Sequence, residues 1–125
     1  MVLGIGTDIV EVQRIAKALT KQGFRDKVYT PGEITYCEAK RSHAAASYAA
    51  RFAAKEALGK ALGTGLTPAV LLEIQVVPTS KGQPKLILSG AMAVKAQEQG
   101  VLQIALSLSH TADLAIAYVV LEGKK

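Results

Sequence analysis

Residues 51–60, near the middle of the chain, read Arg51-Phe52-Ala53-Ala54-Lys55-Glu56-Ala57-Leu58-Gly59-Lys60. At about 100° per residue, a helix over this stretch gathers its alanines on one broad apolar face. The other face carries Lys55, Glu56, Gly59 and Lys60. The pattern therefore predicts a long helix, ending near Leu62, that packs its alanine face against the rest of the protein.

The charged groups on this helix allow two interpretations. Glu56 and Lys60 are four residues apart and lie one above the other, so they can form a solvated ion pair contributing about 0.2–0.5 kcal/mol. Alternatively, they hold a ligand. The helix alone does not distinguish these interpretations, and the rest of the chain is needed.

The segments before the long helix predict one strand and two shorter helices. Residues 2–10 alternate as a strand, with isoleucines on one face and Gly4, Gly6 and Asp8 on the other. A helix is expected from Glu11 to about Lys21. Thr30-Pro31-Gly32-Glu33 fits a capping box that opens a helix to about Lys40. Ser42 is a candidate cap for the long helix.

The segments after the long helix predict two hairpins separated by a helix. Gly63 and Gly65 offer left-handed conformations that can end the long helix. The remaining elements are expected at residues 73–79, 84–88, 89–99, 101–109 and 114–121, with a turn at 80–83. We predict one α+β domain, residues 1–125, in which an antiparallel sheet packs on the long alanine-rich helix.

Composition limits the possible partners and location. Fifteen Lys and Arg residues against ten Asp and Glu give a net charge of +5, which favours nucleic acid, phosphorylated small molecules, an acidic protein or an anionic membrane surface. No apolar run reaches the roughly 20 residues of a membrane helix. No Trp and six other aromatic residues provide few platforms for base stacking. We expect a cytoplasmic protein, neither membrane-bound nor nucleic-acid-binding, in which the single cysteine, Cys37, is a packing residue.

Asp8, Arg51, Glu56 and Lys60 together suggest a site for a metal and phosphate. Magnesium prefers oxygen ligands and is usually held by one or two carboxylates, waters and substrate phosphates. The lysine and arginine would balance phosphate charge that the metal leaves uncovered. This spacing cannot show by itself that Asp8 and Glu56 meet.

Four blocks of sequence resemble the holo-[acyl-carrier-protein] synthases, the short 4'-phosphopantetheinyl transferases. They are Gly4-Ile5-Gly6-Thr7-Asp8-Ile9-Val10-Glu11 with Arg14-Ile15; Arg51-Phe52-Ala53-Ala54-Lys55-Glu56-Ala57 with Lys60-Ala61-Leu62-Gly63-Thr64-Gly65; Lys81-Gly82-Gln83-Pro84; and Ser107-Leu108-Ser109-His110. The blocks occur in the family's order and span nearly the whole chain. The resemblance implies the 4'-phosphopantetheinyl transferase fold and a homotrimer with active sites between subunits.

The resemblance also implies a reaction. The phosphopantetheine arm of coenzyme A moves to a serine of apo acyl carrier protein, in fatty acid biosynthesis, and adenosine 3',5'-bisphosphate is released. By analogy, Asp8 and Glu56 hold Mg²⁺, Lys60 contacts phosphates, and Glu56 is the candidate base, with Glu56 and Lys60 as the catalytic pair. The implied coenzyme A contacts are Arg51, Lys60, Gly63, Gly65, Lys81, Pro84 and His110.

The family's first helix docks the acidic helix of the carrier protein. The basic residues Arg14, Lys17, Lys21 and Arg25 are therefore the expected docking residues, although such a flank is often only a solvated face. Gln83 departs from the family, in which a lysine often stands between the glycine and the proline. Of the remaining residues, His43 is expected to be ordinary surface. Gly4 and Gly6 mark either a bulge or a close approach of the backbone to a ligand.

Two other functions fit parts of the sequence. A basic binding module would use the Arg14 flank and leave Glu56 and Lys60 as a structural pair, but Asp8 would be unexplained. A different magnesium-dependent phosphate enzyme, such as a small phosphatase, would use the same carboxylates. Only phosphopantetheine transfer would add the mass of that group to a carrier protein.

Overall fold

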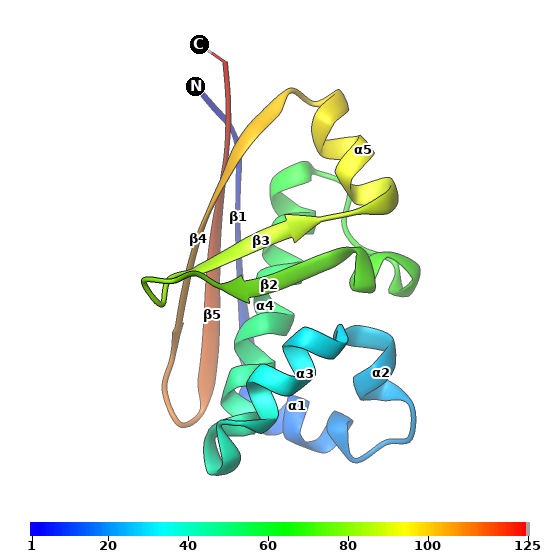
Figure 1. The fold of residues 1–125 in the computed structure, drawn as a ribbon, viewed down its shortest axis with the longest axis vertical. Helices are drawn as coiled ribbons and strands as arrows, with labels where there is room; N and C mark the ends of the chain where they lie inside the picture. The colour runs from blue at the N-terminus through cyan, green and yellow to red at the C-terminus, as the bar shows by residue number, and fades with distance from the viewer. Residues whose placement is uncertain (125) are drawn as a thin grey trace.

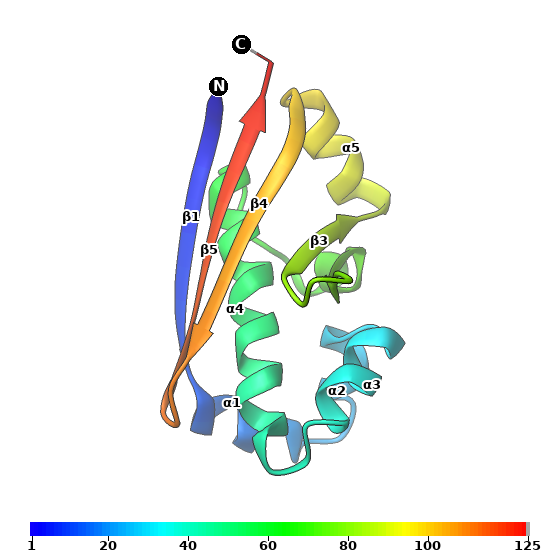
Figure 2. The ribbon, with the colours of Figure 1, turned by 60° about the vertical axis from the view of Figure 1, so that its left-hand side comes forward.

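The computed structural model of this chain describes residues 1–124, which form three layers (Figures 1 and 2). A three-stranded sheet forms one layer and the long helix α4, Ala44–Leu62, forms the middle layer. The third layer consists of α2 (Phe24–Val28), α3 (Pro31–Glu38), β2 (Ile74–Pro78), β3 (Pro84–Leu88) and α5 (Gly90–Glu98). The α+β architecture is as predicted, and α4 is covered on two sides.

The main sheet has the order β1-β5-β4, with antiparallel neighbours. Its strands are β1 (Val2–Glu11), β4 (Val101–His110) and β5 (Leu114–Gly123). Asp8 pairs with Ala117, and Ala117 pairs with Leu108 on the far strand. The chain ends lie together at one end of the sheet (Figure 1), where the Gly123 N–H donates to the Met1 carbonyl oxygen at 2.8 Å. Asp8 therefore lies on one edge strand, and the end of β4 lies on the other.

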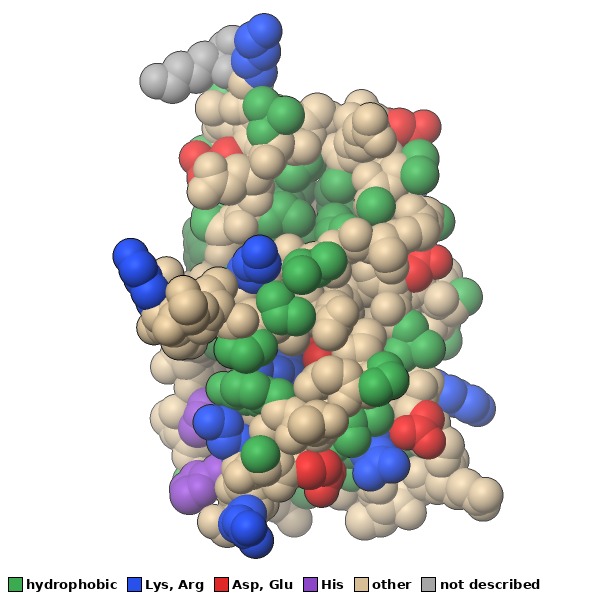
Figure 3. Space-filling view, viewed as in Figure 1, with side chains coloured by type: hydrophobic (Ala, Val, Ile, Leu, Met, Phe, Trp, Pro, Cys, Tyr) green, Lys and Arg blue, Asp and Glu red, His purple; other side chains and the backbone are tan. Residues whose placement is uncertain are grey.

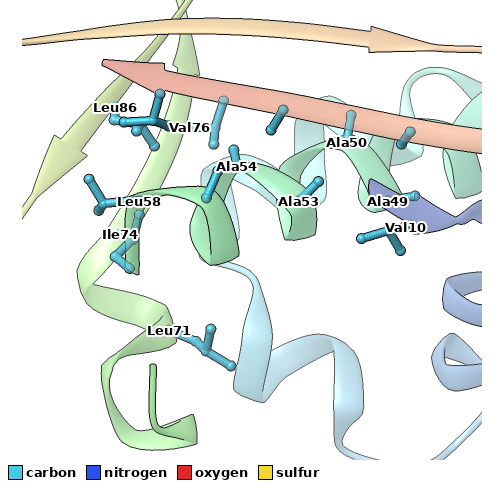
Figure 4. Close-up of a cluster of buried hydrophobic side chains, with 14 of the residues drawn as sticks. Val10, Ala49, Ala50, Ala53, Ala54, Leu58, Leu71, Ile74, Val76 and Leu86 are labelled. Atoms are coloured by element: carbon cyan, nitrogen blue, oxygen red, sulfur yellow. The ribbon is translucent and has the colours of Figure 1, made fainter. Parts of the chain in front are cut away.

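Small side chains join α4 to the sheet. Ala53, Ala54, Ala115 and Ala117 are fully buried between the two layers, and Figure 4 shows alanines of α4 facing β5. On β1, a Cβ added to Gly6 would collide with the Ala57 carbonyl oxygen. The register does shift between Val2 and Gly4. At position 6, glycine is required because the backbone of α4 packs against it, which is a reason that the sequence did not suggest.

Lys55, which was expected on the polar face of α4 opposite the alanines, is fully buried. Its Nζ donates to Glu33 Oε1 at 2.8 Å and to the carbonyl oxygens of Val28 at 2.6 Å and Leu71 at 3.0 Å. The third layer covers this side of α4. A helical wheel identifies one apolar face, but it cannot show that a second layer covers the opposite face.

Most element boundaries follow the local sequence signals. Thr30 and Glu33 form the predicted capping box of α3, and α4 ends at Leu62 with Gly63 as its cap, where φ is +77°. Ser42 does not cap α4, because it belongs to a 3₁₀ turn, Arg41–His43, and α4 begins at Ala44. Three further differences concern helices. The first helix, α1, covers Val12–Leu19 and stops short of Lys21. The helix α2 and a 3₁₀ segment at Pro68–Glu73 were not expected from the sequence.

The hairpin of β2 and β3 has the predicted strands and turn but forms a separate two-stranded sheet. Gly82 of its turn and Pro84 at the start of β3 lie near the end of β4 and the first half of α4. In the part of the chain that the structure describes, no helix combines the length and apolar composition needed to cross a membrane.

Candidate active site

Asp8 and Lys60 meet between β1 and α4. Lys60 Nζ donates to Asp8 Oδ1 at 3.0 Å and to the Thr7 carbonyl oxygen at 3.0 Å. The strand delivers Asp8 because Gly6 lets β1 approach the helix turn that carries Lys60. Lys60 therefore pairs with Asp8, and the Glu56–Lys60 ion pair considered from the sequence is not the pair that forms.

Glu56 lies close to the same pair and is half-buried. Burial, and next the nearby Asp8 carboxylate, raise the pKa of Glu56 above its usual value, whereas Lys60 and Arg14 oppose this shift. We call Asp8, Glu56 and Lys60 the carboxylate cluster. The two acidic side chains that were predicted to meet are thus brought within electrostatic reach of each other.

The carboxylate cluster fits a bound Mg²⁺ ion. A cation would relieve the repulsion between Asp8 and Glu56, and both offer the hard oxygen atoms that magnesium prefers. Within residues 1–124, no group of three or more His, Cys, Asp or Glu side chains could hold a metal. Two carboxylates leave coordination positions for water and substrate phosphates, as in many magnesium sites.

A second group of predicted residues lines a cavity of about 410 Å³. Arg51, Pro84 and His110 meet there, with Gly82 from the turn between β2 and β3. Tyr36, Lys40, His43 and Ser47 also line it, but the sequence did not single them out as ligand contacts. Figure 3 shows histidine side chains beside Lys and Arg at one edge of the molecule. We call this space the cationic cavity, because none of its lining residues is acidic.

Arg51 is nearly enclosed in the wall of the cationic cavity. Arg51 is 5% exposed, and its Nη1 donates to Ser47 Oγ at 3.3 Å. Its Nε has no hydrogen-bond partner among the described residues. A buried cation with spare donors and no acidic neighbour in the cavity is suited to bind an anionic ligand.

Other predicted contacts do not line the cavity. Gly63 and Gly65 form the turn after α4, directly beyond Lys60, with φ values of +77° and +67°. Lys81 is exposed in the turn between β2 and β3, where its neighbour Gly82 is the residue that lines the cavity. The Gly63–Gly65 turn therefore belongs to the end of α4 that carries the carboxylate cluster.

The carboxylate cluster and the cationic cavity lie on different sides of one chain. Glu56 follows Arg51 by five positions, which corresponds to about 140° around the helix axis. Asp8 comes from β1 and His110 from β4, which are the two outer strands of the sheet and lie about 10 Å apart. One chain alone does not bring the two groups of predicted residues into one site.

The predicted docking residues are exposed and follow β1 along the chain. Arg14 and Lys17 lie on α1, Lys21 follows the end of that helix, and Arg25 lies on α2, where it pairs with Asp26 at 3.4 Å. Arg14 acts on the pKa of Glu56. The basic flank therefore begins beside the carboxylate cluster.

Comparison with known families agrees with this arrangement. Residues 4–119 match the model of the 4'-phosphopantetheinyl transferase superfamily. The chain belongs to this superfamily. A holo-[acyl-carrier-protein] synthase of Solibacter usitatus is 46% identical over 126 residues, which cover 98% of this chain and all of that protein. The resemblance recognised in the sequence is thereby confirmed over nearly the full length.

Solved structures of transferases from this superfamily have the same fold. The holo-[acyl-carrier-protein] synthase of Neisseria meningitidis has a TM-score of 0.86 at 35% identity, covering 98% of this chain and 99% of that one. The enzyme of Helicobacter pylori in complex with coenzyme A has a TM-score of 0.81 at 35% identity, covering 94% and 99%. The predicted transferase fold is therefore confirmed.

Proposed function

We propose that this protein transfers the phosphopantetheine group of coenzyme A to a serine of apo acyl carrier protein, releasing adenosine 3',5'-bisphosphate. The observation that carries the proposal is the Asp8–Lys60 ion pair with Glu56 within electrostatic reach of it, in a chain of this family. Phosphoryl transfer requires positioned groups that neutralise the charge developing on phosphate. A carboxylate pair, a lysine and a separate cationic cavity supply groups of this kind.

Each residue has a defined task in this proposal. Asp8 and Glu56 would hold Mg²⁺, which when bound supplies charge stabilisation to the pyrophosphate of coenzyme A. Lys60 has a side chain that is 56% exposed, so it can turn from Asp8 toward phosphate oxygens. A Glu56 carboxylate oxygen would accept the serine proton, directly or through water.

We further propose that the protein works as a homotrimer in the cytoplasm. The sheet face opposite α4 exposes Ile5, Ile9, Leu114, Ile116 and Tyr118, at 39–61% each. Ile9 and Ile116 are paired neighbours on this face, and an apolar patch of this kind commonly marks a contact between proteins. Packing of identical chains would cover it and allow the cationic cavity of one chain to face the carboxylate cluster of the next.

The basic flank, Arg14, Lys17, Lys21 and Arg25, is the proposed docking surface for the acidic carrier protein. Arg14 is the most important of these, because among them it is the one that acts on the pKa of Glu56, and it would guide the acceptor serine toward the transferred phosphorus. Electrostatic docking of this type accelerates association and weakens with salt.

Arg14→Glu is expected to lower kcat/KM for the carrier protein by about tenfold or more at low salt, because repulsion replaces attraction at the docking surface. Affinity for coenzyme A should change little. Steady-state kinetics with each substrate varied measures both effects. Lys124→Glu changes the net charge equally at an exposed site near the end of the chain and serves as the control. Unchanged carrier-protein kinetics, or loss of coenzyme A binding, would assign Arg14 another role.

Mass spectrometry tests the proposed reaction. Apo acyl carrier protein is incubated with the protein, coenzyme A and Mg²⁺, and its mass should rise by one phosphopantetheine group. A carrier protein that is bound but unmodified would support the binding-module alternative. Hydrolysis of coenzyme A without modification of the carrier would support a phosphatase.

A further inference from the structure

Two cations of the cationic cavity share the ring of Tyr36. The Arg51 guanidinium carbon lies 3.9 Å from the ring centroid, and Lys40 Nζ lies 4.7 Å from it. Both distances are within the range of about 6 Å in which an aromatic face attracts a cation. All three side chains line the same cavity. The ring therefore holds together two positive charges that repel each other.

Arg51 has few other contacts that could fix its position. The hydrogen bond to Ser47 is long, at 3.3 Å, and the Nε atom has no partner. Among residues 1–124, the ion pairs involve Arg25, Lys55 and Lys60, and Arg51 has no carboxylate within 4.0 Å. Because a buried charge without a counter-ion is costly, the ring of Tyr36 is the main group that compensates it.

The helix that carries Tyr36 is fixed to the helix that carries Arg51. Glu33, one turn before Tyr36 on α3, forms the fully buried ion pair with Lys55, one turn after Arg51 on α4. Glu33 also accepts hydrogen bonds from the backbone N–H groups of Thr30 at 2.9 Å and Val76 at 2.8 Å. Two adjacent contacts, the Glu33–Lys55 ion pair and the cation–π contact of Arg51 with Tyr36, thus align the two helices.

We propose that Tyr36 is a positioning residue that holds Arg51 and Lys40 ready for a phosphate group of coenzyme A. The inference rests on the proposed function. Lys40, Arg51, His43 and His110 surround a cavity without acidic lining residues, which suits a phosphate. Tyr36 acts through the two cations at a site separate from the carboxylate cluster. It therefore governs binding of the nucleotide end and leaves the chemical step unchanged.

Kinetics and direct binding test this inference. Tyr36→Leu should raise KM for coenzyme A about 5- to 20-fold, with kcat at saturation within about twofold of wild type. Calorimetric affinity for adenosine 3',5'-bisphosphate should fall by a similar factor. Tyr36→Phe, which keeps the ring, should restore both values to within about twofold. If the leucine variant does not fold, Tyr36→Met is compared in its place.

A double-mutant cycle separates positioning from a general structural effect. In an Arg51→Ala background, Tyr36→Leu should weaken bisphosphate binding by less than about twofold, because its main partner is already absent. Thr35→Ala, at the exposed neighbouring position on α3, controls for changes to the helix. Wild-type affinity in Tyr36→Leu, equal losses in both backgrounds, or equal losses in the phenylalanine and leucine variants would overturn the proposal.

The outcome for wild type separates this inference from the proposed function. Normal transfer by wild type together with an unchanged KM in Tyr36→Leu rejects the role of Tyr36 alone. A wild-type protein that neither modifies the carrier protein nor binds adenosine 3',5'-bisphosphate rejects both proposals.

Discussion

Replacing Asp8 or Glu56 by alanine is expected to reduce phosphopantetheine transfer by at least about a thousandfold, since several kcal/mol of charge stabilisation depends on a bound metal and about 1.4 kcal/mol corresponds to tenfold. The two carboxylates lie close enough for Asp8 to raise the pKa of Glu56. Each is therefore expected to be indispensable. Transfer is measured by the mass of the carrier protein over a range of Mg²⁺ concentrations.

Two comparisons make this prediction specific. The fold of Glu56→Ala should remain intact, because the substitution removes a half-buried carboxylate that Asp8 repels. Circular dichroism and thermal unfolding measure this. Glu98→Ala removes an exposed carboxylate from α5 and should retain full activity. Near-normal transfer by either Asp8→Ala or Glu56→Ala at limiting Mg²⁺ would contradict the shared metal site.

Lys55→Met is expected to lower the free energy of unfolding by about 3–5 kcal/mol, because it leaves the buried Glu33 carboxylate without its partner. Burial lowers the pKa of Lys55, although Glu33 opposes this effect. The ammonium group also bonds the Val28 and Leu71 carbonyl oxygens, which would lose their donor. Denaturant unfolding at one fixed protein concentration measures the change, since assembly contributes to apparent stability.

Two further variants identify the cause of this loss. The double variant Lys55→Met/Glu33→Gln should lose less free energy of unfolding than Lys55→Met alone, because no isolated buried charge remains. Lys60→Met, on the same helix, breaks a pair whose lysine is 56% exposed and should cost about 0–1 kcal/mol. Equal losses in the Lys55 and Lys60 variants would contradict the importance of the buried pair.

The sequence was sufficient for the main elements of the fold because their signals are local. The alanine periodicity identified α4, and the Thr30–Glu33 capping box marked the start of α3 as the structure has it. The burial of Lys55 could not be predicted from these patterns. It depends on Glu33, Val28 and Leu71, which are 16 to 27 residues away along the chain.

The candidate site could be predicted only in part for the same reason. Motif resemblance singled out Arg51 and His110, and both line one cavity. Tyr36 carries no sequence motif, and its role becomes visible only when α3 and α4 pack together. The spacing of Arg51 and Glu56 already places them about 140° apart around α4, but the positions of Asp8 and His110 on the two outer strands follow only from the strand order.

We propose that two copies of this chain assemble each active site, one through its carboxylate cluster and the other through its cationic cavity. Asp8→Ala and Arg51→Ala chains, each inactive alone at working coenzyme A concentrations, can be co-expressed with different tags and purified as mixed assemblies. Light scattering should confirm a trimer. Transfer activity should then return to about a third of the wild-type value per site, because every mixed trimer joins an intact Asp8 to an intact Arg51 at one of its three interfaces. Mixed trimers that remain as inactive as the parent proteins, or an active monomer, would contradict the shared site.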